Sequence, residues 1–145
     1  MYSRIIFISF LVLPFLGCSP SPKAIEYGTD FCDYCRMTIV DQQHAAELVT
    51  QKGKVYTFDA IECMIQYKQD NADTPFALEL VNDYLEPGAL LDAAQCSYLV
   101  SPAIPSPMGA NLSAFADQKI GLRMHREHGG KLHSWQSIQS QIGSH

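Results

Sequence analysis

The chain has 145 residues and a formal net charge of -5, with no basic cluster, which argues against a nucleic-acid partner. Hydrophobic residues make up 47% of it, enough for the core of one ordinary domain or of two small half-domains. The sequence has no Ser-His-Asp set, no phosphate-binding loop and no HExxH motif, so we expect a binding protein and not an enzyme.

Residues 1–17 are predicted to be a signal peptide. The apolar run 5–16 is too short for a membrane span and ends at a small residue followed by Cys18. This resembles a bacterial lipobox, although Phe15 stands where Leu is usual. We expect Cys18 to be lipidated and the protein to be anchored to a membrane in the periplasm, with Ser19 favouring the outer membrane. An ordinary signal peptide is the alternative.

Residues 18–30 are predicted to form a flexible tether. The stretch after Cys18 reads SPSPK, which favours neither helix nor strand. Fully extended, such a tether would reach ~40 Å from the membrane. The folded part is then residues 31–145, with halves of about 31–86 and 87–145.

The first half is predicted to run strand, strand, helix, strand. The strands are residues 45–50, 54–58 and 76–81, with a turn at Gly53. Asp59 is expected to cap a helix over residues 60–69, with Glu62 completing a capping box. In that helix the inner stripe is Ile61, Met64 and Ile65.

The second half is predicted to repeat this order. The strands are residues 95–100, 111–116 and 131–135, and a helix capped by Asp117 ends before Gly129-Gly130. Three prolines make residues 101–107 an irregular loop. Helices on one side of antiparallel strands give an α+β fold of two small ββαβ half-domains in tandem.

The segment with the clearest chemistry is residues 32–37, which reads CDYCRM. Cys32 and Cys35 have the spacing that lets two thiols reach one ion around a turn. In an extended segment Cys35 and Met37 would face the same way. Thiolate and thioether are soft ligands that favour Cu(I), and methionine is not a usual zinc ligand.

Met108 is the second sulfur candidate. It lies in the proline-rich loop, in SPMG, where core packing is difficult and where Gly109 lets the backbone approach a partner. Filling a local apolar gap is the alternative. Met64 is expected in the core, and Cys96 as a small core residue.

The remaining candidates have alternatives that the sequence leaves open. Cys63, beside the inner stripe, could be buried, bridged or a ligand, and His44 could turn toward Cys35. The group His125, His128 and His133 could bind zinc or Cu(II), but solvation near a helix end also explains it.

Disulfides are another possibility for the four cysteines after Cys18, for example Cys32–Cys35 and Cys63–Cys96. A thiol-disulfide redox protein that uses Cys32 and Cys35 is the alternative function, although the motif precedes a strand instead of opening a helix.

The chain resembles the NosL family of copper-binding accessory lipoproteins of nitrous oxide reductase. The resemblance covers nearly the whole mature chain and departs from the family in having Arg36 where Gly is usual. It depends on four segments: CDYCRM at 32–37, FD at 58–59 leading to Cys63-Met64, SPMG at 106–109 and HGGK at 128–131.

The resemblance implies a Cu(I) chaperone for maturation of nitrous oxide reductase, linked to the ABC-type membrane complex of the same assembly. It implies a tandem ββαβ fold and Cu(I) ligands at Cys32, Cys35, Met37 and Met108, with Cys63 and His44 in reserve. Another cuproenzyme, such as cytochrome oxidase, is the alternative recipient.

Overall fold

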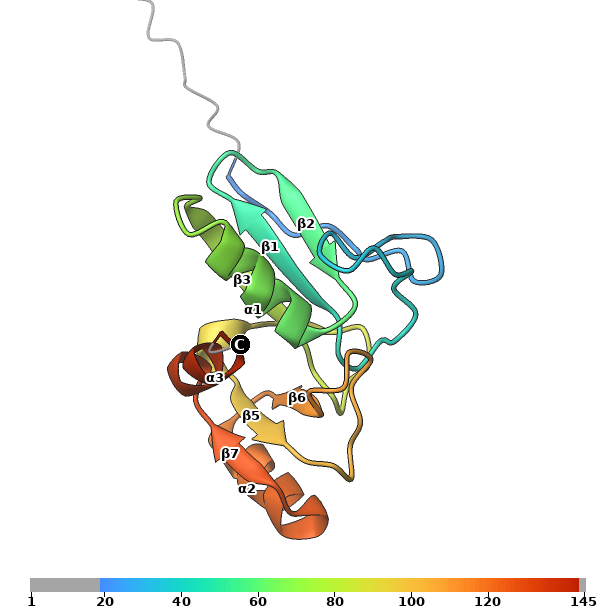
Figure 1. The fold of residues 1–145 in the computed structure, drawn as a ribbon, viewed down its shortest axis with the longest axis vertical. Coiled ribbons are helices and arrows are strands. Elements are labelled where there is room, and N and C mark those ends of the chain that lie inside the picture. The colour runs from blue at the N-terminus through green and yellow to red at the C-terminus, as the bar shows by residue number, and fades with distance from the viewer. Residues whose placement is uncertain (1–18, 144–145) are drawn as a thin grey trace, which may run out of the picture.

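The computed structural model describes residues 19–143 and has the predicted α+β architecture. The signal peptide at 1–17 and lipidation at Cys18 lie outside the described residues. Two antiparallel sheets follow one another along the long axis of the molecule, each with helices packed against it (Figure 1). No helix among residues 19–143 has the length and apolar character needed to cross a bilayer.

The first sheet has the order β2-β1-β3-β4, and the first helix lies between its second and third strands in the chain. β1 pairs antiparallel with both β2 and β3, which makes it a central strand. The elements are β1 (Ala46–Thr50), β2 (Val55–Phe58), α1 (Ile61–Asp70), β3 (Phe76–Asn82) and β4 (Leu90–Asp92).

The second sheet has the order β6-β5-β7. Its strands repeat the ββαβ order predicted from the sequence, and a third helix follows them. The elements are the short 3-10 helix η1 (Ala93–Gln95), β5 (Ser97–Val100), β6 (Leu112–Phe115), α2 (Gln118–His128), β7 (Lys131–His133) and α3 (Trp135–Ile142).

The structure departs from the sequence predictions in the end of its last strand, in an additional strand and in the extent of the first sheet. The last strand ends at His133 instead of residue 135, because the Ser134 hydroxyl accepts from the Ser137 amide at 3.2 Å and starts α3. Residues 90–92 form β4, a strand that was not predicted, and it pairs with β3. The first sheet therefore extends beyond residue 86, where the sequence placed the end of the first half.

The helix α1 begins as predicted, but its expected capping box is wrong. The N-cap is Ala60, and no side chain caps the helix. The Asp59 carboxylate instead accepts a hydrogen bond from Cys35, and Glu62 accepts from Ser106 and from the Ala110 amide. The predicted inner stripe is confirmed, since Ile61, Met64 and Ile65 are all buried. Both acidic side chains are thus directed to groups outside their own helix.

The two halves share one hydrophobic core. The main buried cluster joins residues of the first sheet and α1, such as Phe58 and Met64, to Tyr98, Leu112 and Ile138 of the second half. Trp135 stacks on Tyr98 with ring centroids 5.3 Å apart and donates to Glu79 at 2.9 Å. The halves are consequently one packed body and not two independent units.

Contacts with the fold begin inside the segment that the sequence predicted as tether 18–30. The Lys23 amide donates to Glu47 at 3.0 Å, Ile25 is buried, and Asn82 donates to the Tyr27 hydroxyl at 2.6 Å. Part of the predicted tether, from Lys23 onward, therefore packs against the first sheet.

Candidate metal centre

The CDYCRM segment forms a closed turn. The Cys32 amide donates to the Met37 carbonyl at 2.8 Å, and the Arg36 amide donates to the Cys32 carbonyl at 3.0 Å. Arg36 has φ 68°, in the left-handed region that favours glycine. The segment is therefore not extended between Cys35 and Met37, and the expected same-side geometry does not follow from alternation.

The turn is held against the edge strand β2. The Asp33 amide donates to the Thr57 carbonyl at 2.8 Å, and the Thr57 amide donates back to the Asp33 carboxylate at 2.8 Å. Because β2 runs directly into α1, this pairing brings the CxxC turn to the start of the helix. Asp59, at the end of the connection from β2, and Cys63, in the first turn of α1, lie there.

Four ligand atoms meet at this point. The thiols of Cys32, Cys35 and Cys63 and a carboxylate oxygen of Asp59 all lie within 4.8 Å of one another. Among residues 19–143 this is the one group of three or more His, Cys, Asp or Glu side chains with such spacing. Cys32, Cys63 and Asp59 are buried and Cys35 is partly exposed, so the centre opens to solvent on the side of Cys35.

The thiols differ in acidity because one sulfur receives several hydrogen bonds. The Cys63 thiol donates to Cys32, and the backbone amides of Asp59 and Cys35 add to this, which lowers the pKa of Cys32 to about 6. The same bond raises the pKa of Cys63 well above its usual range. Burial raises the pKa of Cys35 to about 11. These hydrogen bonds favour the thiolate at Cys32 over thiolates at Cys35 and Cys63.

Asp59 is the least expected member of the centre. It is 2% exposed, its Oδ1 accepts from the Cys35 thiol at 3.4 Å, and its Oδ2 has no partner among the described residues. Sequence reasoning took it for a helix cap. Its place between β2 and α1, four residues before Cys63, was the available signal that it could lie near that thiol.

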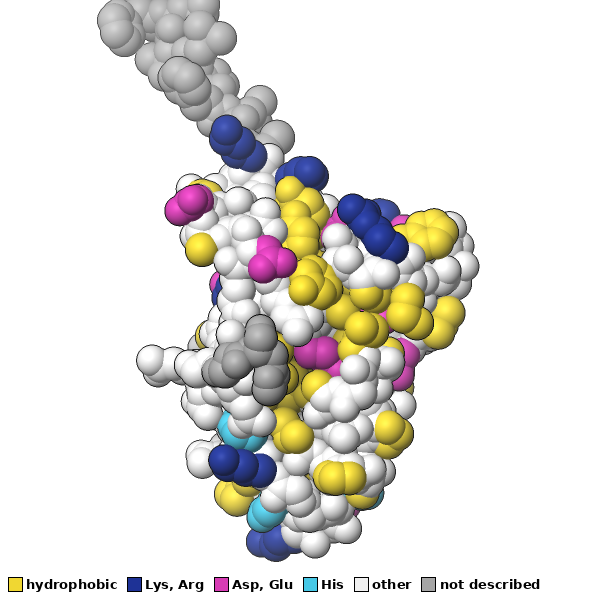
Figure 2. Space-filling view, viewed as in Figure 1, with side chains coloured by type: hydrophobic (Ala, Val, Ile, Leu, Met, Phe, Trp, Pro, Cys, Tyr) yellow, Lys and Arg dark blue, Asp and Glu magenta, His cyan; other side chains and the backbone are white. Residues whose placement is uncertain are grey.

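The two predicted methionines lie at the surface. Met37 is 52% exposed in the CxxC turn, and Met108 is 41% exposed in the loop of the second half. Four exposed apolar side chains, Phe31, Tyr34, Met37 and Val40, come from the turn and its flanks. Figure 2 shows apolar surface gathered on the side of the molecule where Figure 1 draws this turn. The sulfur atoms of both methionines are therefore accessible to solvent, unlike the buried thiols of Cys32 and Cys63.

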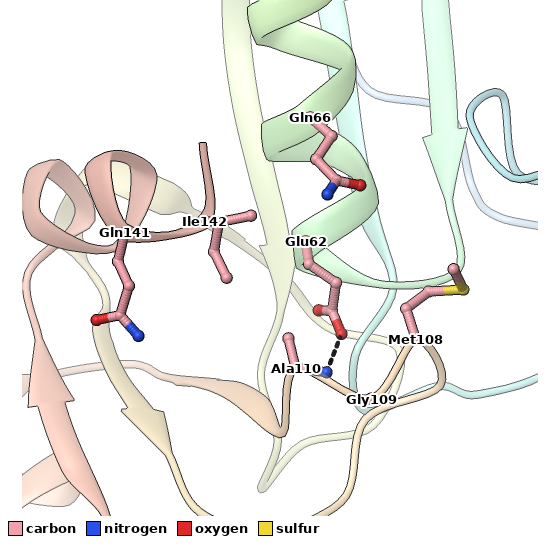
Figure 3. A pocket seen from close by; sticks show the side chains of 7 residues that line it. All are labelled: Glu62, Gln66, Met108, Gly109, Ala110, Gln141 and Ile142. Atoms are coloured by element: carbon pink, nitrogen blue, oxygen red, sulfur yellow. Dashed lines mark hydrogen bonds between the residues drawn. The ribbon is translucent and has the colours of Figure 1, made fainter. Parts of the chain in front are cut away.

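The Met108 loop is joined to α1 through Glu62. Ser106 Oγ and the Ala110 amide both donate to Glu62 Oε1, the latter at 3.2 Å, and the Asn111 amide donates to Ser106 Oγ at 2.9 Å. Figure 3 shows Glu62 between Ala110 and Gln66, beside a cavity of about 420 Å³. Burial raises the pKa of Glu62. The loop is therefore fixed to the residue that precedes Cys63.

The other candidates lie away from the centre. His44 uses both ring nitrogens, with Asp41 at 3.0 Å and Ser113 at 3.1 Å, and it does not join the thiol group. Cys96 donates to the Asp92 carbonyl at 3.3 Å, and burial raises its pKa to about 12. All four described cysteines are free thiols, so neither the Cys32–Cys35 nor the Cys63–Cys96 disulfide of the alternative is present among the described residues.

The C-terminal histidines do not form a ligand group in the described residues. His133 is buried, with Nδ1 3.0 Å from the Ser137 hydroxyl, and burial lowers its pKa. His125 and His128 lie in the last turn of α2, where basic groups interact favourably with the helix dipole. The alternative of solvation and dipole stabilisation fits their positions.

Comparison with known proteins gives one family and one fold. The family model described as NosL matches residues 23–142. Among solved structures, the crystal structure of the copper chaperone NosL from Shewanella denitrificans matches with a TM-score of 0.70 and 22% sequence identity. The match covers 81% of this chain and 95% of that one. No curated protein sequence matches significantly.

Proposed function

Because the chain belongs to the NosL family, we propose that it is a copper chaperone that carries Cu(I) as cargo. The single observation that supports this most strongly is the meeting of three thiols within 4.8 Å. Sulfur donors in this number suit Cu(I), which accepts low coordination numbers and soft ligands. The name of the Shewanella protein, a copper chaperone, supports the same role.

The cargo site is proposed to combine two sets of sulfur atoms. Cys32 and Cys35 were predicted as ligands from the sequence, and the position of Cys63 adds a third thiol. Met37 and Met108 are the thioether ligands on the exposed side. Asp59 is close enough to accept the proton that Cys35 must lose when its sulfur binds the metal.

Transfer is proposed to proceed by ligand exchange. A two- or three-coordinate Cu(I) leaves room for an incoming thiolate or thioether from the recipient. As each new bond to copper forms, one sulfur of this chain leaves, so the ion is never released to solvent. The exposure of Met37 and Met108 supports this order, because the recipient would meet the thioethers before the buried thiols. Such a carrier needs no catalytic chemistry.

The proposal is tested by anaerobic titration of the reduced protein with Cu(I) against a competing chelator. We expect one tightly bound ion, and weaker binding in Cys35→Ser and in Met108→Ala. A fully reduced protein that does not compete with the chelator, or two variants that bind like the wild type, would rule out this function at this site.

The recipient and location are also proposals. We propose nitrous oxide reductase as the recipient, with the ABC-type membrane complex of its assembly as a further partner. Lipidation at Cys18 would anchor the chain on the periplasmic side, with the outer membrane favoured. Copper content of the reductase from cells that lack this chain tests the first point. Membrane fractionation of Cys18→Ala tests the second. Copper loss from cytochrome oxidase instead would identify the alternative recipient.

Thiol-disulfide exchange by Cys32 and Cys35 is the second candidate function. The low pKa of Cys32, about 6, favours it, since thiolates are the reactive form. Against it, Cys32 is fully buried and cannot meet a protein substrate without local opening. An insulin-reduction assay separates the two, because a copper chaperone without redox activity gives no turnover.

A further inference from the structure

The most unusual contact between the halves is made by a buried carboxylate, which accepts hydrogen bonds from a loop of the second half instead of capping its own helix. Glu62 is 4% exposed in the first turn of α1, and its Oε1 receives both Ser106 Oγ and the Ala110 amide. A buried charge is costly unless it is hydrogen-bonded, and bonds to a carboxylate are stronger than neutral ones. Burial of the Glu62 carboxylate therefore depends on these hydrogen bonds from the loop, since Glu62 does not cap its own helix.

The two bonds enclose Met108. Ser106 precedes it by two residues and Ala110 follows it by two, so one carboxylate oxygen fixes both flanks of the methionine. The Ser106 hydroxyl also accepts from the Asn111 amide, which closes the loop on itself. Figure 3 shows the Met108 side chain leaving this loop on the side opposite to Gln141 and Ile142.

The helix residue next to Glu62 is Cys63, one of the three thiols of the metal centre. Glu62 directly precedes Cys63 in α1, so the helix that carries the third thiol also holds the loop that carries the thioether. We propose that Glu62 is a positioning residue: it fixes the Met108 loop so that a methionine of the second half stays at the thiols of the first. This rests on the proposed function, in which Met108 is a ligand.

A purely structural role makes a different prediction. The halves are also joined away from the Met108 loop, where the Trp135 indole donates to Glu79 Oε2 at 2.9 Å. If Glu62 only held the halves together, Glu62→Ala and Glu79→Ala would act alike. They would lower stability, and copper binding would follow stability in both. Glu79→Ala is therefore the matched control.

The test is a double-mutant cycle on Cu(I) affinity, measured by chelator competition. We expect Met108→Ala and Glu62→Ala each to weaken binding about tenfold, the size typical of lost orienting contacts. Because Glu62 acts through Met108, the double variant should be no weaker than either single one. We expect Glu62→Gln to bind within about twofold of wild type, since its carboxamide oxygen can accept both bonds, and Glu79→Ala to do the same.

A second readout does not need copper. Amide exchange at Ala110 should accelerate in Glu62→Ala and in Ser106→Ala, and not in Glu79→Ala. Multiplying effects in the double variant, about hundredfold in total, or unchanged exchange at Ala110, would overturn the positioning role. If the wild type binds no Cu(I), the proposed function itself fails and the role falls with it, a result distinct from failure of the cycle alone.

Discussion

The two halves of the molecule each place an aspartate at the start of a helix, and the two aspartates have different partners. Asp117 caps α2 in the expected way, with its Oδ1 accepting from the Ile120 amide at 2.8 Å. Asp59, one residue before the N-cap of α1, makes no cap bond and accepts from Cys35. Asp117 contributes to helix stability, whereas Asp59 is directed into a group of thiols.

The difference shows how a repeated structural unit can be specialised. Both halves keep the strand, strand, helix, strand order, and they share one core. Only the first half brings three thiols together, and the second half contributes a loop with one thioether and a separate buried thiol, Cys96. The candidate metal ligands are therefore concentrated where β2 meets α1, and the second half contacts that region through the Met108 loop.

The largest effect is expected from breaking the shared core. Trp135→Ala removes a buried ring that stacks on Tyr98 and leaves Glu79 without its indole donor. We expect a loss of about 3–5 kcal/mol in the free energy of unfolding. Urea unfolding followed by circular dichroism measures it.

Leu122→Ala is the control, because this exposed side chain of α2 should change stability by less than about 0.5 kcal/mol. The two halves should unfold in one transition in both variants, as one packed core requires. Amide exchange that shows the first sheet protected while the second is open would contradict a common core.

The next largest effect is expected on Cu(I) affinity, and it should depend on which half the substituted cysteine lies in. Cys63→Ser should weaken Cu(I) binding about hundredfold, or ~2.7 kcal/mol, because a serine hydroxyl is a poor ligand for a soft ion. Cys96→Ser is the matched control, a buried thiol of the second half whose loss should leave copper affinity unchanged. Equal losses from both would mean that the halves contribute alike to binding.

The fold was largely predictable because both halves carry strong local signals. Alternating apolar residues gave the strands, and Asp117 with Gly129 marked both ends of α2. The short strand β4 and the helix α3 were missed. Their three and eight residues are stabilised by pairing with β3 and by burial of Trp135, and neither contact can be deduced from local pattern.

The sequence predicted which kinds of donor atom form the metal centre, but it did not identify all the residues that supply them. Cys32 and Cys35 could be selected by spacing. Cys63 stayed in reserve, because nothing local says that the CxxC turn pairs with the end of β2 through Asp33 and Thr57. Asp59 was assigned to a cap for the same reason, since a local rule is valid only where no tertiary contact competes for the side chain.

The pKa values of the three thiols in the first half predict how the free energy of unfolding depends on pH. The folded pKa of Cys32 is about 6, below its ordinary value near 9, so its contribution to stability is present above about pH 9 and lost as pH falls toward 6. Cys35 and Cys63 have raised pKa values, and their contribution is lost as pH rises beyond about 9. The free energy of unfolding of the copper-free protein should therefore rise from about pH 6 to 9 and then fall.

Thiolate absorbance near 240 nm checks the assignment during the same titration. We expect one thiolate to appear near pH 6, and this step to move to higher pH in Cys63→Ala, which removes the hydrogen-bond donor to the Cys32 sulfur. Cys96→Ser should leave the step in place. A titration without any thiolate below pH 8 would show that the hydrogen bond from Cys63 does not stabilise the Cys32 anion.

The smallest effect is expected at the two aspartates, whose substitutions should change the free energy of unfolding differently. Asp117→Ala removes a cap bond and should lower the free energy of unfolding by about 1 kcal/mol. Asp59→Ala removes no cap bond. It removes a buried carboxylate oxygen that has no partner among the described residues, and it loses only a weak hydrogen bond from the Cys35 thiol, so stability should stay equal or rise. Urea unfolding at neutral pH compares them directly. A loss at Asp59 as large as the loss at Asp117 would mean that the first aspartate supports its helix after all, and that its position beside Cys35 is secondary.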